Sequence, residues 1–422
     1  MKVLKFGGTS VGSAQRMKDV AKLITDGEQK IVVLSAMSGT TNTLVEISDY
    51  LYKKNPEGAN EVINKLEAKY KQHIEELYST EEYKQKTLEF VKSVFDYIRS
   101  YTKDIFTLFE EKVILAQGEI ISTNMVTNYL CEQGVKATLI PALEFMRTDK
   151  NSEPDLTYIR EKLAIQLEAN PDYEIYITQG FICRNAYGEI DNLQRGGSDY
   201  TASLIGAAVN ASEIQIWTDI DGMHDNDPRI VDKTSPVRQL HFEEAAELAY
   251  FGAKILHPTC VQPAKYANIP VRLLNTMEPT APGTLISNET EKGKIKAVAA
   301  KDNITAIKIK SSRMLLAHGF LRKVFEIFES YQTAIDMVCT SEVGVSMSID
   351  NTKHLNEIVD DLKKYGTVTV DHDMCIVCVV GDLEWENVGF EAKALDAMRD
   401  IPVRMISFGG SNYNISFLIR RS

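Results

Sequence analysis

The first 36 residues constrain the fold more than any other stretch of the chain. A largely apolar run at 3–6, which includes Lys5, is followed directly by the glycine pair Gly7 and Gly8. Apolar residues then recur at helical spacing as far as Ile24, and a second apolar run, IVVLSA, follows at 31–36. Strand, helix and strand in this order indicate a βαβ unit, and such units build parallel sheets.

Further apolar runs extend this pattern through the first two thirds of the chain. Between 44 and 130 the sequence is charged, nearly free of proline and glycine, and without a strand pattern, which predicts a helical insertion. We therefore expect an α/β fold, an αβα sandwich with a mainly parallel sheet, over residues 1–294. The additional strands are expected at 137–140, 174–181, 213–220 and 270–274.

The pattern changes after Gly293. Strand-like and helix-like segments then alternate in the order βαββαβ, the ferredoxin-like order, and a second such unit begins near Cys375 but lacks its last helix and strand. A spare strand at 296–300 can complete it, so we expect a first unit at about 303–371 inserted in a second made of about 295–302 and 373–422. The expected segments of the first unit are strands at 304–312, 334–340, 344–349 and 367–370 and helices at 315–331 and 354–365. Those of the second are strands at 375–381, 401–407 and 414–421 and a helix near 392–398.

Composition excludes some classes of protein. A net charge of −12 argues against non-specific binding of nucleic acid, and no apolar stretch approaches the roughly 18 residues of a membrane span. The six cysteines have no paired spacing, which suits reduced thiols in a cytoplasmic protein without disulfides. The acidic residues after Trp217 do not have the spacing of an EF-hand, so we expect no protein-held metal.

Two glycine pairs carry the first chemical signal. Lys5 precedes Gly7 and Gly8 in an order that fits neither a P-loop nor a Rossmann fingerprint, so a different nucleotide fold is implied. Glycines let main-chain N–H groups approach phosphate oxygens at a helix N-terminus, although a tight turn with a solvated lysine explains the pattern as well. The second pair lies in 193–207 beside Arg195, with Ser198 and Asp199 near the helix start, where either can act as a cap. Two such sites suit a substrate with more than one anionic group, for which phosphate and carboxylate are the candidates.

Two further stretches supply polar residues at the end of a strand. The stretch WTDIDGMHDNDPRI, at 217–230, contains Arg229, and the stretch FGAKILHP, at 251–258, contains Lys254. Ligands of α/β proteins bind beyond the carboxyl ends of strands, and both cations are available to phosphates there. A nucleotide-binding loop is the interpretation that we favour.

These motifs together resemble those of the aspartate kinase family. The matching stretches are KFGGTSV, VVLSAMSGTTN, QGE at 117–119, RGGSDYTA, WTDIDG with DPR, and FGAKILHP, in this order over essentially the whole chain. The resemblance implies a catalytic amino-acid-kinase domain followed by paired ACT domains, in a monofunctional enzyme. The implied reaction is phosphorylation of the L-aspartate side-chain carboxylate by ATP with Mg²⁺, the first step towards lysine, threonine and methionine.

The resemblance also implies roles for single residues. Lys5 would contact the transferring phosphoryl group and Asp199 would orient it, and both are the expected catalytic residues. The nucleotide would be held by Lys5, Phe6, Gly7, Gly8, Thr218, Asp219, His224, Arg229 and Lys254. Aspartate would be held by Ser35, Thr41, Glu119, Arg195 and Ser198, with Arg195 on its α-carboxylate and Glu119 on its ammonium.

A regulatory site is implied in the first ferredoxin-like unit. The segment that contains MLLAHGFL and TSEVGVSM is similar to the lysine-binding segment of the lysine-sensitive branch, which implies feedback inhibition by L-lysine in a homodimer or homotetramer. The expected effector residues are Met314, Phe320, Leu321, Ile335, Asp336, Ser341 and Glu342. Two alternatives stay open: a kinase for another carboxylate or carbamate, and a decayed kinase that senses an amino acid.

Overall fold

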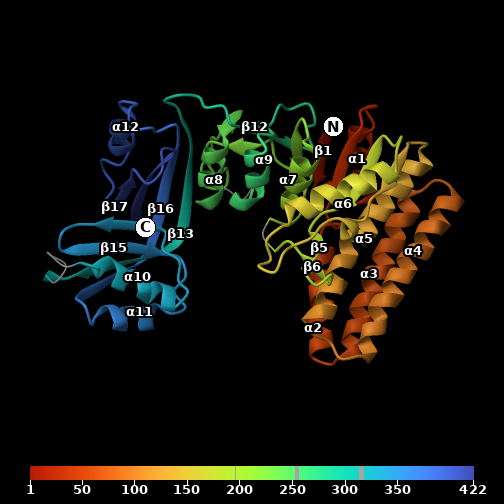
Figure 1. The fold of residues 1–422 in the computed structure, drawn as a ribbon, viewed down its shortest axis with the longest axis horizontal. Helices are drawn as coiled ribbons and strands as arrows, with labels where there is room; N and C mark the ends of the chain where they lie inside the picture. Colours follow the sequence, from red (N-terminus) through yellow and green to blue (C-terminus); the bar gives the residue numbers. More distant parts are fainter. Residues whose placement is uncertain (195, 252–255, 313–317) are drawn as a thin grey trace. The chain divides into compact units, whose positions relative to one another are not determined.

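The computed structural model describes residues 1–194, 196–251, 256–312 and 318–422 (Figure 1). The expected positions Arg195, Lys254 and Met314 lie outside the described residues. The chain forms two compact units: one from the described parts of 1–223 and 255–288, the other from those of 224–254 and 289–422. The segment 224–254 thus groups with the second unit, whereas we expected it within a catalytic part at 1–294.

A mainly parallel sheet forms the centre of the first unit, as the opening βαβ pattern predicts. Its strand order is β12-β11-β7-β1-β2-β4-β3, and every neighbouring pair is parallel except β11 with β12. The strands are β1 (Lys2–Phe6), β2 (Lys30–Leu34), β3 (Ala137–Leu139), β4 (Ile175–Gln179), β7 (Ile214–Thr218), β11 (Val271–Asn275) and β12 (Thr284–Ser287), and β5 (Ile182–Arg184) and β6 (Ile190–Asn192) form a separate hairpin.

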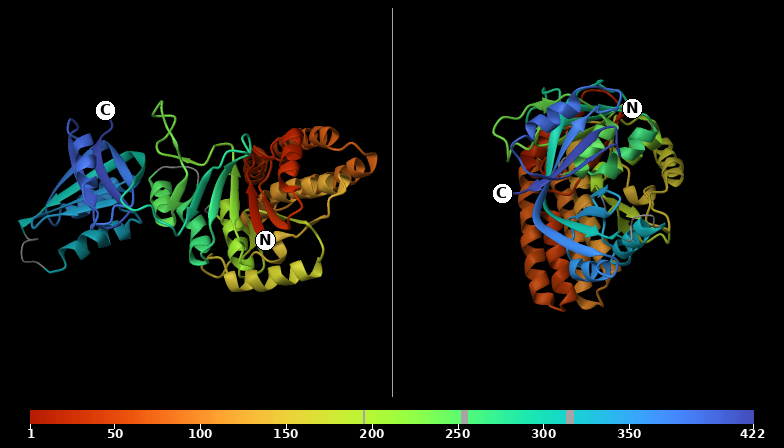
Figure 2. Two further views of the ribbon diagram at one scale, coloured as in Figure 1. Left: turned by 90° about the horizontal axis from the view of Figure 1, so that it is seen from above. Right: turned by 90° about the vertical axis from the view of Figure 1, so that its left-hand side faces the viewer.

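Helices cover both faces of this sheet. On β1, Leu4 and Phe6 enter a core shared with the insertion helices, whereas Lys5 faces the opposite side and α7 (Gly197–Val209). The long helices α3, α4 and α5 of the insertion run side by side in Figure 1, and the right-hand view of Figure 2 shows the same group of helices from the side. The other helices are α1 (Ala14–Ile24), α2 (Thr40–Tyr52), α3 (Pro56–Leu77), α4 (Glu81–Ser100), η1 (Tyr101–Lys103), α5 (Leu108–Glu132), η2 (Ala142–Glu144), α6 (Leu156–Ala169), η3 (Pro258–Val261) and α9 (Gln262–Tyr266).

The second unit contains an antiparallel sheet in the order β14-β15-β13-β16-β18-β17. Its chain order gives βαββαβ followed by a shortened second unit, and the first half of β13 pairs with β16 of that unit. The elements are β8 (Met223–His224), β9 (Pro236–Val237), β10 (Gln239–His241), α8 (Phe242–Tyr250), β13 (Ile295–Lys310), α10 (Phe320–Ser330), β14 (Met337–Thr340), β15 (Gly344–Ile349), α11 (Leu355–Leu362), β16 (Thr367–Gly381), α12 (Phe390–Ala397), β17 (Val403–Phe408) and β18 (Asn414–Arg420).

Three details of this unit differ from the sequence prediction. The strands expected at 296–300 and 304–312 form one strand, β13, and those expected at 367–370 and 375–381 form one strand, β16. Irregular register between Lys301 and Ala306 interrupts the pairing without ending either strand. The helix expected from 315 is described from Phe320, because Gly319 takes a left-handed conformation at its N-cap.

Candidate active site

Lys5 and Asp199 form an ion pair at the centre of the first unit. Strand alternation directs Lys5 away from the core that holds Leu4 and Phe6, and its Nζ lies 2.8 Å from Asp199 Oδ1. The two side chains are 11% and 16% exposed, which leaves both within reach of a ligand. The structure therefore places together the two residues expected to be catalytic, and Asp199 can orient the ammonium of Lys5.

The loop after β1 is shaped by close main-chain packing. A Cβ on Gly8 would lie 2.9 Å from the carbonyl oxygen of Ala36, a distance that side chains do not tolerate. Gly196, at the N-cap of α7, has φ +72°, a conformation that favours glycine. The main chain at Gly7 lies close to Lys5 Nζ, and the first turn of α7 carries Asp199, the partner of Lys5. Glycine main chain and a helix N-terminus beside a lysine suit a phosphate site.

A cavity of about 300 Å³ lies beside this ion pair. Of the residues expected to bind aspartate, Ser35, Thr41, Glu119 and Ser198 line it, and the Ser35 hydroxyl donates to Ser198 Oγ over 2.9 Å. The remaining lining residues are Gly8, Ala36, Met37, Ser38, Gly39, Asn42, Phe181 and Gly197. Residues from the ends of β1 and β2, from α2 and α5, and from α7 therefore converge on one small polar pocket.

Glu119 is the most unusual group in this cavity. Its residue is 4% exposed, and among the described residues its Oε2 has no hydrogen-bond partner. Burial raises the pKa of its carboxyl group to about 8, although main-chain hydrogen bonds, including one from Ala36, act in the opposite direction. A buried carboxyl group that lines a cavity and has one oxygen without a hydrogen-bond partner is suited to bind a cationic ligand group.

The residues expected to bind nucleotide are distributed over both units. Thr218 ends β7 and Asp219 follows it, exposed, at the carboxyl edge of the parallel sheet. Phe6 is wholly buried and stacks on Trp217 with ring centroids 5.6 Å apart, so its side chain is part of the core. In the second unit, His224 Nδ1 lies 2.9 Å from Thr234 Oγ1, and Arg229 pairs with Asp227 through two nitrogens.

The expected effector residues form two groups in the second unit. Ser341 and Glu342 are exposed in the turn after β14, and the bond from Ser311 N to Val343 O ties this turn to the end of β13, towards α10. Phe320 and Leu321 begin α10. Ile335 and Asp336 precede β14, at the other end of the strand.

Asp336 already has partners within the chain. Its side chain is 2% exposed, and its Oδ1 lies 3.1 Å from Lys301 Nζ and accepts a hydrogen bond from the Tyr250 hydroxyl, also over 3.1 Å. Lys301 lies 2.9 Å from Asp350 as well, so two carboxylates share one ammonium. Burial raises the pKa of Asp336, and Lys301 lowers it. The sequence analysis named Asp336 but not its partners Lys301, Tyr250 and Asp350.

Comparison with known proteins places the chain in a family. Residues 1–275 match the amino acid kinase family, and residues 377–422 match an ACT domain. The chain is 35% identical over 453 residues to aspartokinase 1, chloroplastic, of Arabidopsis thaliana, covering 100% of this chain and 77% of the relative. The chain belongs to the aspartokinase family. It is also 32% identical to the lysine-sensitive aspartokinase 3 of Escherichia coli (strain K12), covering 99% of this chain and 95% of the relative.

Solved aspartokinase structures agree with this fold over its whole length. The crystal structure of Escherichia coli aspartokinase III in complex with lysine and aspartate matches with a TM-score of 0.80 at 32% identity, over 100% of this chain and 96% of that one. The Clostridium acetobutylicum aspartate kinase matches with a TM-score of 0.87 at 26% identity, over the same shares of the two chains. The family and fold class predicted from the sequence are thereby confirmed.

Proposed function

We propose that the cavity beside Lys5 binds L-aspartate and that this aspartokinase-family chain phosphorylates its side-chain carboxylate with ATP, giving 4-phospho-L-aspartate. The observation that carries the proposal is Glu119, a buried carboxyl group whose Oε2 has no hydrogen-bond partner among the described residues, in the same small cavity as Ser198 and next to the Lys5–Asp199 pair. A ligand with an ammonium group and a reactive carboxylate satisfies both ends of this arrangement. Escherichia coli aspartokinase III, with a solved complex that contains aspartate and ADP, supports the choice of ligand.

In this reaction the protein positions the two substrates and neutralises the negative charge that develops on the phosphoryl group. The attacking carboxylate of aspartate is ionised at neutral pH, so no general base is needed. Lys5 neutralises charge that develops on the phosphoryl oxygens, Asp199 orients Lys5, and the glycine loops present main-chain N–H groups. Ser35, Thr41, Ser198 and Arg195 complete the binding of aspartate around Glu119.

The nucleotide contacts belong to the same proposal. Thr218, Asp219, His224, Arg229 and Lys254 would hold ATP together with Gly7 and Gly8. Magnesium would arrive with ATP and bridge its phosphates. No group of three or more His, Cys, Asp or Glu side chains suited to hold a metal occurs among the described residues, so the metal-binding oxygens would come mainly from the nucleotide.

Trapping of the acyl phosphate with hydroxylamine tests the function. The protein is incubated with Mg-ATP and hydroxylamine, and with L-aspartate, L-glutamate or N-acetyl-glutamate in turn. We expect hydroxamate with L-aspartate. Product with glutamate alone would overturn the substrate assignment, and no product with any acid would favour a decayed kinase that only senses an amino acid.

We further propose that L-lysine regulates the enzyme through the first ferredoxin-like unit. The lysine-sensitive Escherichia coli relative and its complex with lysine support this choice. Within one chain, the β14 residues 337–340 separate Asp336 from Ser341, a span of roughly 16 Å in an extended strand. This separation favours an effector site completed by a second copy of the chain. The homodimer or homotetramer and the cytoplasmic location stay predictions. No described helix has the length and apolar character to cross a lipid bilayer.

A further inference from the structure

The helical insertion contributes a buried hydroxyl next to the cavity. Tyr70, on α3, is 1% exposed, and its hydroxyl lies 2.6 Å from Thr40 Oγ1. Thr40 is the first residue of α2 and is itself 1% exposed, whereas its neighbours Gly39 and Thr41 line the cavity. Tyr70, about 30 residues away along the sequence, therefore holds Thr40, which lies between two residues that line the cavity.

The start of α2 has no capping side chain. Its N-cap, Gly39, takes a left-handed conformation with φ +83° and offers no capping side chain. Ser, Thr, Asp or Asn at this position would satisfy a main-chain N–H of the first turn, so a glycine leaves those groups open towards a ligand. The bond between Thr40 and Tyr70 fixes this turn from the side away from the cavity.

Thr40 also connects Tyr70 with the helix that carries Glu119. Gly118 on α5 packs so closely that a Cβ there would lie 2.9 Å from Ala36 Cβ and 3.3 Å from Thr40 Cγ2. Movement of Thr40 would change this contact and, with it, the position of Glu119, the next residue. Burial raises the pKa of Tyr70 well above its usual value, and the charge of nearby Glu119 raises it further, so Tyr70 stays a neutral hydroxyl.

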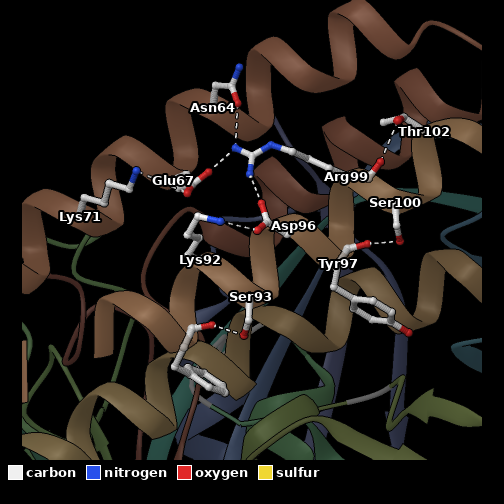
Figure 3. A network of polar contacts seen from close by, with 11 residues as sticks. Asn64, Glu67, Lys71, Lys92, Ser93, Asp96, Tyr97, Arg99, Ser100 and Thr102 are labelled. Carbon is white, nitrogen blue, oxygen red and sulfur yellow. Dashed lines mark hydrogen bonds and ion pairs between the residues drawn. The ribbon is translucent and has the colours of Figure 1, made fainter. Parts of the chain in front are cut away.

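Contacts between α3 and α4 of the insertion fix the position of Tyr70. Its ring packs on Phe95 of α4, with centroids 5.9 Å apart. One turn before Tyr70, the buried Glu67 pairs with Arg99 of α4, and Arg99 also donates to Asn64 over 2.8 Å (Figure 3). The two helices thus fix α3 at the level from which Tyr70 reaches α2.

We propose that Tyr70 is a positioning residue for the amino-acid subsite, holding the N-terminus of α2 and the adjoining Glu119 in place through its hydrogen bond to Thr40. The helical insertion then has a role in the reaction, as the support of the cavity wall that receives the amino acid. The inference rests on the proposed binding of aspartate in this cavity. Tyr70 does not touch the substrate and acts only through Thr40.

Tyr70→Phe tests the proposal, because it removes the hydroxyl and keeps the ring. The KM for L-aspartate should rise roughly 3- to 10-fold, the range that one neutral hydrogen bond spans, while kcat and the KM for ATP stay within about 2-fold. Tyr78→Phe is the matched control, since the Tyr78 hydroxyl is also buried and donates to Met125 O over 2.5 Å at the end of the same helix. It should lower the thermal midpoint similarly and leave the KM for L-aspartate unchanged.

Thr40→Val removes the same hydrogen bond from the other side. It should raise the KM for L-aspartate as much as Tyr70→Phe does, and the double variant should show little further rise, because the two changes remove one interaction. If Tyr70→Phe does not fold, Thr40→Val alone decides. An unchanged KM in an active Tyr70→Phe or Thr40→Val protein, or an equal rise in Tyr78→Phe, overturns the role of Tyr70. A wild-type protein that forms no hydroxamate with aspartate contradicts the proposed function instead.

Discussion

Lys5 and Glu119 have different partners in the proposed reaction: Lys5 contacts the transferring phosphoryl group, and Glu119 binds the ammonium group of aspartate. Lys5 is already held in place by Asp199, so it needs no rearrangement to meet a developing negative charge. Among the described residues Glu119 Oε2 has no partner, and burial raises the pKa of this carboxyl group, so Glu119 gains most from a ligand that brings its own cation. Substitutions at these two positions should therefore affect different kinetic parameters.

Lys5→Ala should lower kcat by roughly 10²-fold or more, because a preorganised donor to the transition state is lost. The KM for aspartate should change much less, since the amino acid is held elsewhere in the cavity. Steady-state kinetics with Mg-ATP measures both values. Lys2→Ala is the matched control, because Lys2 lies at the other end of β1 and forms an ion pair with the exposed Glu28. Equal loss of activity in both variants would contradict the role of Lys5.

The titration of Glu119 predicts how the KM for aspartate depends on pH. Burial raises the pKa of this group to about 8, so below that pH the free protein holds it as a neutral acid that must lose its proton to bind an ammonium. The KM should fall as the pH rises from about 6.5 to about 8.5 and then level off. Glu119→Gln should have a high KM that does not follow this titration. A KM that rises with pH over the same range would contradict the assignment.

Sequence reasoning reached most of this site because the chemistry resides in local motifs. Lys5, Ser35, Thr41, Glu119, Ser198 and Asp199 belong to such motifs, and the structure brings these six together. Tyr70 and Lys301 were missed, because each lies within a helix or strand pattern that explains its presence without a function. Their partners Thr40 and Asp336 are 30 and 35 residues away along the chain, and only the fold joins them.

At the scale of elements, the pairing of α3 with α4 depends on a partly buried charge network (Figure 3). The side chain of Glu67 is 8% exposed and has Arg99 as its main partner, with Lys71 at 3.5 Å. Arg99 also contacts Asp96 over 3.0 Å. A carboxylate in this position is stable only while a cation stays beside it.

Arg99→Ala should destabilise the first unit by about 2–3 kcal/mol, because Glu67 then loses a charged hydrogen-bond partner while it remains largely buried. Urea unfolding followed by circular dichroism measures the change. Lys65→Ala is the control, since Lys65 and Glu61 form an ion pair on the same helix with side chains 75% and 70% exposed, and its loss should cost less than about 0.5 kcal/mol. If both substitutions lower the free energy of unfolding by a similar amount, the buried network contributes no more to stability than an exposed ion pair.

The boundaries of helices and strands were predictable where one periodicity dominates. The prediction was wrong for the two long strands that continue past polar residues. Polar residues near Asn303 and Asp373 looked like strand ends, so β13 and β16 were each predicted as two strands. Both residues take positive φ, at +61° and +53°, a conformation that Asn and Asp tolerate better than most side chains. They lie at the irregularities in the pairing of β13 with β16, which continue through both ferredoxin-like units within one sheet.

At the scale of the whole molecule, α8 contacts several parts of the second unit. At its N-cap, His241 stacks on Tyr413 with ring centroids 5.2 Å apart, and in its second half Glu247 accepts a 2.6 Å hydrogen bond from Asn414. At its end, Tyr250 bonds to Asp336. The residues that follow α8 include the motif FGAKILHP, in which Lys254 is expected to bind ATP.

This arrangement predicts inhibition by L-lysine rather than by L-threonine or L-methionine. Two carboxylates, Asp336 and Asp350, share the ammonium of Lys301, and exposed Glu342 lies at the other end of β14, so this part of the unit has an excess of negative charge that a cationic amino acid can balance. Activity measured at subsaturating aspartate should fall with L-lysine, with a coupling of about 1–3 kcal/mol between the sites. Sedimentation should show at least a dimer, because one chain separates the two groups of effector residues. Inhibition by threonine alone, or by none of the three, would remove the lysine assignment, and a monomer that lysine still inhibits would remove the site between two copies.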